Sequence, residues 1–316
     1  MKNKRIAFAG QVSDTDIRLL RIFRTVVENG GFSSAEVELN ISVSAISIAV
    51  ADLEQRLGMK LCQRGRAGFS LTDEGSEVYQ AVLQLLASLE DFKTQVNSIT
   101  AQLKGELNIG ITDNLVTMYK HMRVTNSLAA LKELGPEVRI NIRMMPPGEI
   151  EKSVLDGRLH IGVIPDIKHL TGLEYIDLYD EESQLYCGHR HSLFALPEKQ
   201  LTLSLINQQD TVLPAAAVPL ENKTQLQKMR STATATDREG AAFLILSGQY
   251  VGFLPTHYAE RWVHEKRMQP LLPGAFNYRT RYAAITRKGA RPNLVLQTFI
   301  AELNRPENDL AFQAKR

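Results

Sequence analysis

Cysteine is scarce in this 316-residue chain, which contains only Cys62 and Cys187. Two cysteines so far apart in the sequence do not make a disulfide framework, and such scarcity fits a reducing cytosol. We expect two buried, unreactive thiols. The alternative is a redox-sensing pair, which requires that the thiols approach each other and that one has a lowered pKa.

Long hydrophobic runs are missing as well. The apolar segment AAFLIL at 241–246 has the length of a core segment, whereas a membrane helix needs about 20 apolar residues. The N-terminus starts with basic residues, but its apolar stretch is shorter than the roughly 7 residues of a signal-peptide core. We therefore expect no membrane partner, no export and a cytoplasmic location.

The remaining composition is that of a globular protein. Hydrophobic residues make up 44% and charged residues 23%, which excludes a disordered chain or a fibrous repeat. The length predicts two or three compact units.

Signatures of catalysis and of cofactor binding are also absent from the sequence. The seven histidines lack metal-ligand spacing, and His189 and His191 stand two apart in an expected turn. There is no glycine-rich phosphate loop, paired-carboxylate signature or nucleophile elbow. We expect no metal, no cofactor and no enzymatic activity.

Acidic residues are missing from one segment, Gln55 to Thr72, which carries Arg56, Lys60, Arg64 and Arg66. The surrounding region, 1–102, is nearly balanced, with 11 basic and 12 acidic residues. A short cationic segment suits contact with phosphates, whereas a solvated surface usually mixes both signs.

A first helix is expected over about 15–29, opened by Ser13 or Asp14 and closed by the glycines at 30–31. Its apolar residues recur on one face, as in an amphipathic helix. These residues are Leu19, Leu20, Phe23, Val26 and Val27.

Two shorter signals predict a helix, a sharp corner and another helix. Ser33 and Glu36 form a capping-box pattern that predicts a helix over about 34–39. The Asn-Ile pair at 40–41 then forms the corner, since Asn tolerates left-handed backbone geometry. Ser42 caps the next helix.

The third helix has one apolar face and one face of small residues. Ile46, Val50 and Leu53, flanked by Ala45 and Ala49, should pack inward. A small outer face after a sharp turn is typical of a helix-turn-helix, whose second helix enters a major groove about 12 Å wide. An ordinary helical corner is the alternative. The outward residues are Ser44, Ser47, Ile48, Ala51 and Gln55.

The segment 57–75 continues with an apolar anchor, a basic turn containing glycines and a new helix start at 72–74, which together predict a wing. Apolar residues then recur at alternating spacings of four and three, as in a coiled-coil seam that pairs two copies. A monomeric core helix is the alternative. The seam consists of Val78, Val82, Leu85, Leu89, Phe92, Val96, Ile99 and Leu103.

The stretch from Leu19 to Val78 resembles the LysR-type transcriptional regulators. The resemblance implies a winged helix-turn-helix that binds operator DNA as a dimer through the following linker helix. The matching residues, in order, are Phe32-Ser33, Ser42, Leu53-Glu54, Leu57-Gly58, Arg64, Leu71-Thr72 and Gly75.

The chain departs from this family at two places on the third helix. The family usually has Gln-Pro where Val43-Ser44 stands, and often Arg-Gln where Ile48-Ala49 stands. Because Arg, Asn and Gln make the best bidentate base contacts, direct hydrogen-bond readout should be weak here. We expect Val43 and Ile48 to touch thymine methyls or sugar edges, Ser44 and Ser47 to contact phosphates or bases, and DNA shape to supply much of the rest.

The predicted DNA-binding residues are Ser33, Ser42, Val43, Ser44, Ser47, Ile48, Arg56, Arg64 and Arg66. The basic stretch at 2–5 is expected to be a disordered tail; the alternative is a contact in the minor groove.

Beyond Lys104 the pattern changes to short strands alternating with helices. Strands at 105–112, 138–144 and 159–164, with helices at 115–134 and 149–156 between them, predict a parallel sheet covered by helices. This pattern is compatible with one subdomain or two. Further strands are expected at 178–188, 210–214, 230–236, 250–255 and 281–288, and a final helix at about 293–303.

The resemblance extends more loosely over this half, through LNIGIT, VLDGRLHIGVI, HRHSLFA, GQYVGFLP and the segment from Tyr282 to Leu303. It implies two α/β subdomains like those of periplasmic binding proteins, with a small-molecule effector between them. The chain would cross between the subdomains near 164–167 and 270–278. His160 stands where the family usually has Asp.

Three stretches should line the effector cleft, because ligands in such folds bind beyond the carboxyl ends of strands. The first, Thr112, Asp113 and Asn114, begins a helix and suits an anion, although Thr112 could simply cap the helix and Asp113 would repel an anion. Met145, Pro146 and Pro147 form a rim with few hydrogen-bond donors. Thr234, Thr236 and Asp237 lie at the end of a strand on the opposite lobe.

The expected architecture is an α/β protein with an N-terminal winged helix-turn-helix dominated by helices. Its parts are a tail (1–12), a DNA-binding domain (13–72), a linker helix (73–104) and an effector domain (105–316). Subdomain I would comprise about 105–165 and 275–316, and subdomain II about 166–274.

The expected partners are double-stranded DNA with a pseudo-palindromic operator, a small-molecule effector for which an anion is a candidate, and RNA polymerase. The chain would form a homodimer, and by the resemblance a homotetramer, with dimer contacts at Val78, Val82, Leu85, Leu89, Phe92 and Val96. The rival classes are an enzyme fused to a DNA-binding head and a sensor that does not touch DNA.

Overall fold

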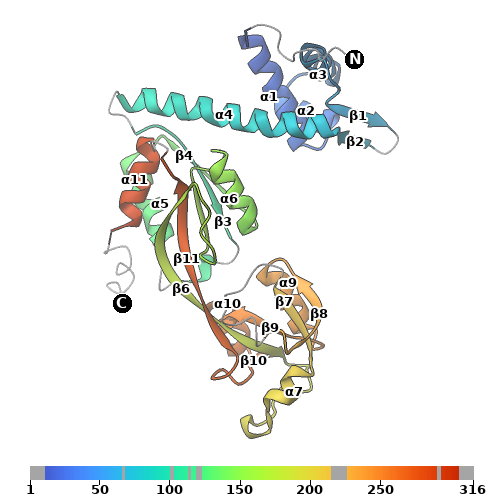
Figure 1. Cartoon of the computed structure of the whole chain (residues 1–316), viewed down its shortest axis with the longest axis vertical. Coiled ribbons are helices and arrows are strands. Elements are labelled where there is room, and N and C mark those ends of the chain that lie inside the picture. Colours follow the sequence, from blue (N-terminus) through green and yellow to red (C-terminus); the bar gives the residue numbers. More distant parts are fainter. Residues whose placement is uncertain are drawn as a thin grey trace. The chain divides into compact units, whose positions relative to one another are not determined.

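The structure is a computed structural model that describes residues 11–65, 68–99, 103–112, 115–118, 123–214, 226–289 and 293–305. The chain divides into two compact units, Met1–Phe92 and Lys93–Arg316, each considered by itself (Figure 1).

The N-terminal unit consists of helices and one hairpin, as expected. The elements in chain order are α1 (Asp14–Glu28), α2 (Phe32–Leu39), α3 (Val43–Leu57), β1 (Cys62–Gly65), β2 (Gly68–Leu71) and α4 (Asp73–Ile99).

The capping box of this unit lies on α1, where we did not expect it. The Asp16 amide donates to Ser13 Oγ over 3.3 Å, and the Ser13 amide donates to Asp16 Oδ2 over 2.8 Å. Helix α2 begins at Phe32 without a side-chain cap, so the predicted box of Ser33 and Glu36 is wrong. Glu36 accepts instead from the Val43 amide over 3.2 Å, because the corner brings the start of α3 within its reach.

The corner between α2 and α3 has the predicted chemistry. Asn40 adopts the left-handed conformation with φ of 52°, and Ser42 Oγ accepts from the Ala45 amide over 3.3 Å. The two helices meet at 106°. Together they have the length and composition of a bent membrane span, but no single helix in the described residues is long and apolar enough to cross a bilayer.

The core of the N-terminal unit confirms the predicted inner face of α3. Ile46, Val50 and Leu53 are at most 1% exposed, and Ala49 is buried beside them. Ala45 is exposed, contrary to expectation, because it lies at the first turn of the helix, where it projects beyond the packed face.

The predicted wing is a two-stranded antiparallel hairpin, with Cys62 paired to Leu71 at its base. Glu54, on the last turns of α3, holds this base through the amides of Leu61 and Cys62, at 2.9 and 3.2 Å, and accepts a further hydrogen bond from Lys60. The wing is therefore attached to α3 by a buried carboxylate.

Helix α4 uses part of the predicted seam for its own core. Val82 is 3% exposed, and Val78 and Leu89 pack against the core of the N-terminal unit. Within one chain these positions cover the helix-turn-helix, and their predicted role in a dimer stays a prediction. Among the seam residues whose side chains the structure describes, Leu85, Phe92 and Val96 remain exposed. The helix ends at Ile99, and Leu103 packs into the core of the C-terminal unit.

The C-terminal unit is built on one mixed, nine-stranded sheet, in the order β4-β3-β5-β11-β6-β9-β7-β8, with β10 paired to β6. The strands are β3 (Gly105–Ile111), β4 (Val138–Met144), β5 (Ile161–Pro165), β6 (Leu173–Gly188), β7 (Asp210–Pro214), β8 (Arg230–Ala235), β9 (Val251–Pro255), β10 (Met268–Pro270) and β11 (Asn277–Arg287).

The first three strands form the predicted parallel arrangement, with β3 between β4 and β5. The helix expected over 115–134 is shorter, because a 3-10 turn precedes it. The helices are η1 (Leu115–Thr117), α5 (Arg123–Leu134), α6 (Pro147–Leu155), η2 (Glu198–Gln200), α7 (Leu203–Asn207), α9 (Arg238–Leu246), α10 (Thr256–His264) and α11 (Leu294–Leu303).

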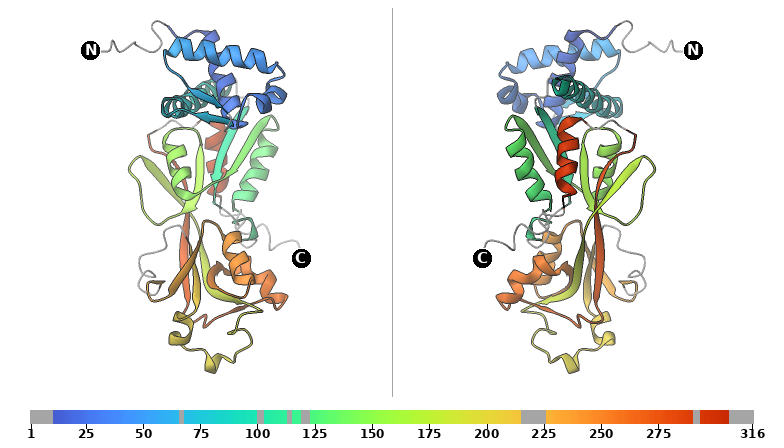
Figure 2. Two further views of the ribbon diagram at one scale, coloured as in Figure 1. Left: turned by 90° about the vertical axis from the view of Figure 1, so that its right-hand side faces the viewer. Right: turned by 90° about the vertical axis from the view of Figure 1, so that its left-hand side faces the viewer.

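Two long antiparallel strands, β6 and β11, run through both halves of this unit (Figures 1 and 2). Leu178 and Tyr179 belong to the core of the first half, and Leu185 and Cys187 to the core of the second. The first crossing between halves therefore lies inside β6, later than the expected 164–167. The physical reason is that β6 and β11 pair continuously, so the chain crosses within a strand instead of in a loop.

Candidate functional sites: a groove-reading helix and an effector cleft

The outer face of α3 is free of the core, as a groove-reading helix requires. Ile48 is 62% exposed, Ser44 is exposed, and Ser47 is half-buried. Val43 differs from our expectation because it packs partly against the core, which leaves less of it available to a base. Ser33 and Ser42 are exposed at the starts of α2 and α3.

The cationic segment contributes fewer free charges than its sequence predicts. Arg56 Nε donates to Asp16 Oδ1 over 3.1 Å, and Arg56 also donates to the Gln11 carbonyl over 3.0 Å. Arg56 therefore joins α3 to α1, and its predicted contact with DNA would have to compete with this ion pair. The side chain of Arg64 and all of Arg66 lie outside the described residues.

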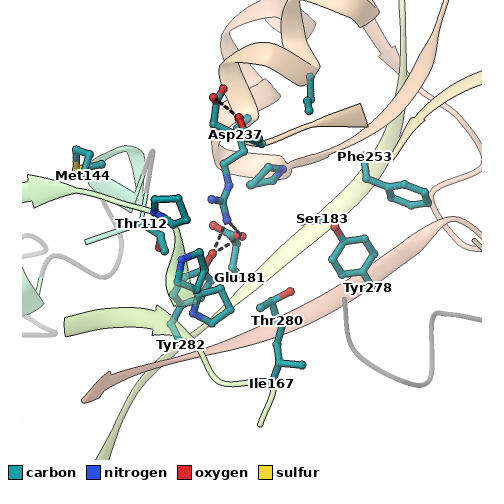
Figure 3. A pocket seen from close by; sticks show the side chains of 18 of the residues that line it. Thr112, Met144, Ile167, Glu181, Ser183, Asp237, Phe253, Tyr278, Thr280 and Tyr282 are labelled. Carbon is teal, nitrogen blue, oxygen red and sulfur yellow. Dashed lines mark hydrogen bonds and ion pairs between the residues drawn. The ribbon is translucent and has the colours of Figure 1, made fainter. Parts of the chain in front are cut away.

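A cavity of about 380 Å³ lies between the two halves of the C-terminal unit (Figure 3). Six of the nine predicted effector residues line it: Thr112, Met145, Pro146, Pro147, Thr236 and Asp237. Thr234 is exposed and does not line it; its neighbour Ala235 does, because successive side chains of a strand point to opposite sides. Asp113 and Asn114 lie outside the described residues.

The cleft contains a buried charged network that the sequence did not predict. Arg238, the first residue of α9, donates to Glu181 Oε2 over 2.9 Å and also donates to the Tyr282 hydroxyl. Glu181 is 2% exposed. Burial of the Glu181 carboxylate is tolerable because the partly exposed Arg238 pairs with it.

The same carboxylate extends the network to the first half of the unit. His257 Nε2 lies 3.1 Å from Glu181 Oε1, and His257 Nδ1 lies 2.6 Å from Thr117 Oγ1. Thr117 belongs to η1, whereas His257 is on α10. Glu181 thus connects elements of both halves at the point where β6 crosses between them.

The tyrosines of the cleft are neutral hydrogen-bonding groups. Burial, and then the nearby carboxylate of Glu181, raise the pKa of Tyr282 far above its usual range. Burial also raises the pKa of Tyr278, whose hydroxyl interacts with Ser183 (Figure 3). Neither phenol therefore brings a charge to an effector.

The described lining does not favour a simple anion. Its charged side chains are Glu181, Asp237 and Arg238, and the guanidinium is already paired with Glu181. Asp237 caps α9 by accepting from the Gly240 amide over 2.7 Å. An anionic effector would therefore have to compete with Glu181 for Arg238.

A period-2 signal in the sequence could have identified the missed residues. Glu181 and Ser183 on β6, and Tyr278, Thr280 and Tyr282 on β11, alternate along their strands and share one face of the cleft. Arg238 directly follows the predicted Asp237 but is on a helix, where the strand pattern no longer applies.

Among the residues that the structure describes, no group of three or more His, Cys, Asp or Glu side chains is placed to hold a metal ion.

Two family descriptions match this architecture. Residues 17–76 match the bacterial regulatory helix-turn-helix protein, lysR family, and residues 100–305 match the LysR substrate binding domain. The chain belongs to the LysR family. It is a LysR-type transcriptional regulator, with a DNA-binding helix-turn-helix and a substrate-binding domain of two α/β halves.

A curated LysR-type relative is similar over almost the whole length. It is the HTH-type transcriptional activator BauR of Pseudomonas aeruginosa, 54% identical over 300 residues, or 95% of this chain and 98% of the relative.

Two solved LysR structures share the fold. CbnR covers 91% of this chain and 97% of its own, with a TM-score of 0.65 and 17% identity. Full-length CbnR complexed with its target DNA covers 91% of this chain and 98% of its own, with a TM-score of 0.64 and 19% identity.

Proposed function

We propose that this LysR-type regulator activates transcription from a pseudo-palindromic operator in response to a small molecule bound in the cleft between the halves of its effector domain. Activation is proposed because the 54% identical relative BauR is named a transcriptional activator. The protein would act in the cytoplasm and contact RNA polymerase.

We further propose that it binds as a homodimer, and that two dimers form a tetramer. The support is the exposed apolar row on α4, in which Leu85, Phe92 and Val96 are 37%, 65% and 45% exposed. Three large apolar side chains spaced at seven and four along one helix are typical of a surface that is covered by a partner.

The observation that carries the DNA-binding proposal is the exposed, nearly uncharged outer face of α3. Ile48 is 62% exposed although isoleucine is normally buried, and it is flanked by Ser44 and Ser47. Such a face can approach bases closely, and the Ile48 side chain would touch a thymine methyl.

A gel-shift titration on the upstream region of the protein's own gene tests this proposal. Ile48→Ala should bind about tenfold more weakly, which corresponds to about 1.4 kcal/mol. When uracil replaces the contacted thymine, the affinity of wild type should fall. The affinity of Ile48→Ala should be the same on thymine and uracil DNA. Equal losses for both proteins would contradict the methyl contact.

A matched control is Val37→Ala, because Val37 on α2 is 87% exposed and lies off the outer face of α3. This variant should bind operator like wild type. If both variants bind like wild type, α3 does not read the operator through Ile48.

The effector proposal is tested by a thermal-shift screen of metabolites on the full chain. A ligand selective for the folded state raises the apparent melting temperature, by mass action. The same ligand should change the footprint on operator DNA. Arg238→Met should reduce the ligand response while leaving operator binding by the free protein unchanged.

A further inference from the structure

A second cavity, of about 250 Å³, adjoins the effector cleft in the first half of the C-terminal unit. The two cavities share Thr112 at the end of β3 and Met144 at the end of β4. We call this second space the side cavity. Its described lining is mostly aliphatic, and it includes Ile142 on β4 and Tyr179 on β6.

The side cavity differs from the cleft in its chemistry. No described lining residue carries a charge at neutral pH, because its polar groups are the hydroxyls of Thr112, Thr125 and Tyr179. Burial raises the pKa of Tyr179 far above its usual range, so this phenol stays protonated. An uncharged, apolar group gains free energy in such a space, whereas a charged group would lose its hydration without a partner.

The junction between the two cavities holds a buried hydroxyl that bonds to no described residue. Thr112 is 3% exposed, and its Oγ1 makes no hydrogen bond to the part of the chain that the structure describes, whereas its own amide donates to the Val163 carbonyl over 3.2 Å. Buried polar groups in folded proteins are nearly always satisfied, so each exception calls for an explanation. Thr112 faces both cavities, so a ligand that spans them would meet this hydroxyl.

We propose that the effector is amphipathic: it places an uncharged hydrocarbon chain or a single aromatic ring in the side cavity and a hydrogen-bonding group at Thr112. Its polar remainder lies in the cleft beside Arg238 and Glu181. A cavity of about 150 Å³ is enough to hold benzene in another protein, so 250 Å³ accommodates a group of this size. The inference rests on the proposed function, because it assigns a ligand class to the same cleft.

Chain-length dependence tests the side cavity directly. The probes are straight-chain alkanoates from acetate to octanoate and the matching 1-alkanols, titrated into the full chain by calorimetry. Affinity should rise about fourfold per added methylene until the cavity is filled, and then level off or fall. Flat affinity along both series, or no binding of any member at millimolar concentration, overturns the inference.

A filled cavity provides the decisive variant. Ile142 on β4 lines the side cavity and is 47% exposed, so Ile142→Trp can fill the space without disturbing the buried core. This variant should abolish the chain-length dependence and bind the shortest probes like wild type. Leu203→Trp is the matched control, because Leu203 is 53% exposed on α7, outside both cavities, and it should keep the dependence.

Thr112→Val tests the hydroxyl separately. Because Thr112 Oγ1 has no partner among the described residues, its removal should leave the melting temperature unchanged or raise it. Affinity for every probe of sufficient length should fall about tenfold, with the chain-length slope retained. Unchanged affinity would show that the hydroxyl is not a ligand contact.

Two further readouts separate this inference from the function on which it rests. If the free protein shifts operator DNA and a metabolite changes the footprint, but no chain-length dependence is found, the proposed function stands and the amphipathic class is wrong. If Ile142→Trp changes the oligomeric state instead of the probe affinity, a second copy of the chain covers the side cavity, and the inference is overturned.

Discussion

Arg56 Nε donates to Asp16 Oδ1 over 3.1 Å and so joins helix α3 to the start of α1. Arg56→Gln should therefore lower the melting temperature of the N-terminal unit. A lost phosphate contact would reduce the slope of operator affinity against salt concentration by about one. Because Arg56 is engaged with Asp16, we expect this slope to change little. Melting curves measure the stability, and gel shifts at several salt concentrations measure the slope. A slope reduced by about one, with unchanged stability, would instead support the phosphate contact that the sequence predicts for Arg56.

Acid should destabilise the N-terminal unit through two carboxylates. The Ser13 amide and Arg56 hold the pKa of Asp16 below its usual value. Burial alone would raise the pKa of Glu54, but hydrogen bonds from Lys60 and from the Leu61 and Cys62 amides outweigh it and hold the pKa low.

For a group whose pKa is lower in the folded state, the stabilisation is present above the unfolded pKa and is lost as the pH falls through the folded pKa. Stability of the unit should thus be constant from pH 7 to about 5 and fall below about pH 4.5. Urea unfolding between pH 3 and pH 7 measures it. Glu54→Gln should be less stable at pH 7 and lose less on acidification; an unchanged pH dependence would rule out Glu54 as a source.

Gly75 packs its α-carbon against the base of the wing. A Cβ at this position would lie 2.0 Å from the Leu61 carbonyl oxygen, a contact that backbone movement alone can relieve. Gly75→Ala should cost about 1–3 kcal/mol of unfolding free energy and weaken operator binding, because α4 and the wing would separate. Gly274→Ala is the control, since its Cβ would meet no atom within 4 Å. Equal urea midpoints for the two variants would contradict the close contact.

The buried pair of Glu181 and Arg238 gives a double-mutant prediction. Glu181→Gln removes the partner of a guanidinium whose side chain is only 19% exposed, and should cost about 3 kcal/mol. Replacing both, with Arg238→Met, should cost less than Glu181→Gln alone, because no buried charge is then left unpaired. Denaturant unfolding of the four proteins of the cycle measures the coupling; additive losses would show that the pair does not interact.

Cys187 should be unreactive, in agreement with the expectation of an inert thiol. It is completely buried, and burial raises the pKa of its thiol to about 12. Cys62 is half-buried, at the base of the wing. Alkylation at pH 8 followed by mass spectrometry should label Cys62 first and Cys187 only after unfolding. Equal labelling rates in the native protein would contradict this order.

The sequence predicted the elements whose signals are local. The corner at Asn40, the cap at Ser42 and the buried stripe of α3 follow from a backbone preference, a side-chain hydrogen bond and a period of 3.6 residues. The parallel start of the effector domain follows in the same way from alternating strand and helix patterns. The signals for the corner, the cap and the stripe are each complete within the two helices that they join or form.

Only the tertiary structure decided which polar residues find each other. Asp16 and Arg56 lie 40 residues apart in the sequence, and Glu181 and Arg238 lie 57 apart, so no local pattern predicts either pair. The use of Val82 on α4 as core, while Phe92 stays exposed, depends likewise on what packs against each part of the helix. The sequence by itself thus determined the family and the elements with local signals, because their causes are short-range; the charged network of the cleft was decided by long-range packing.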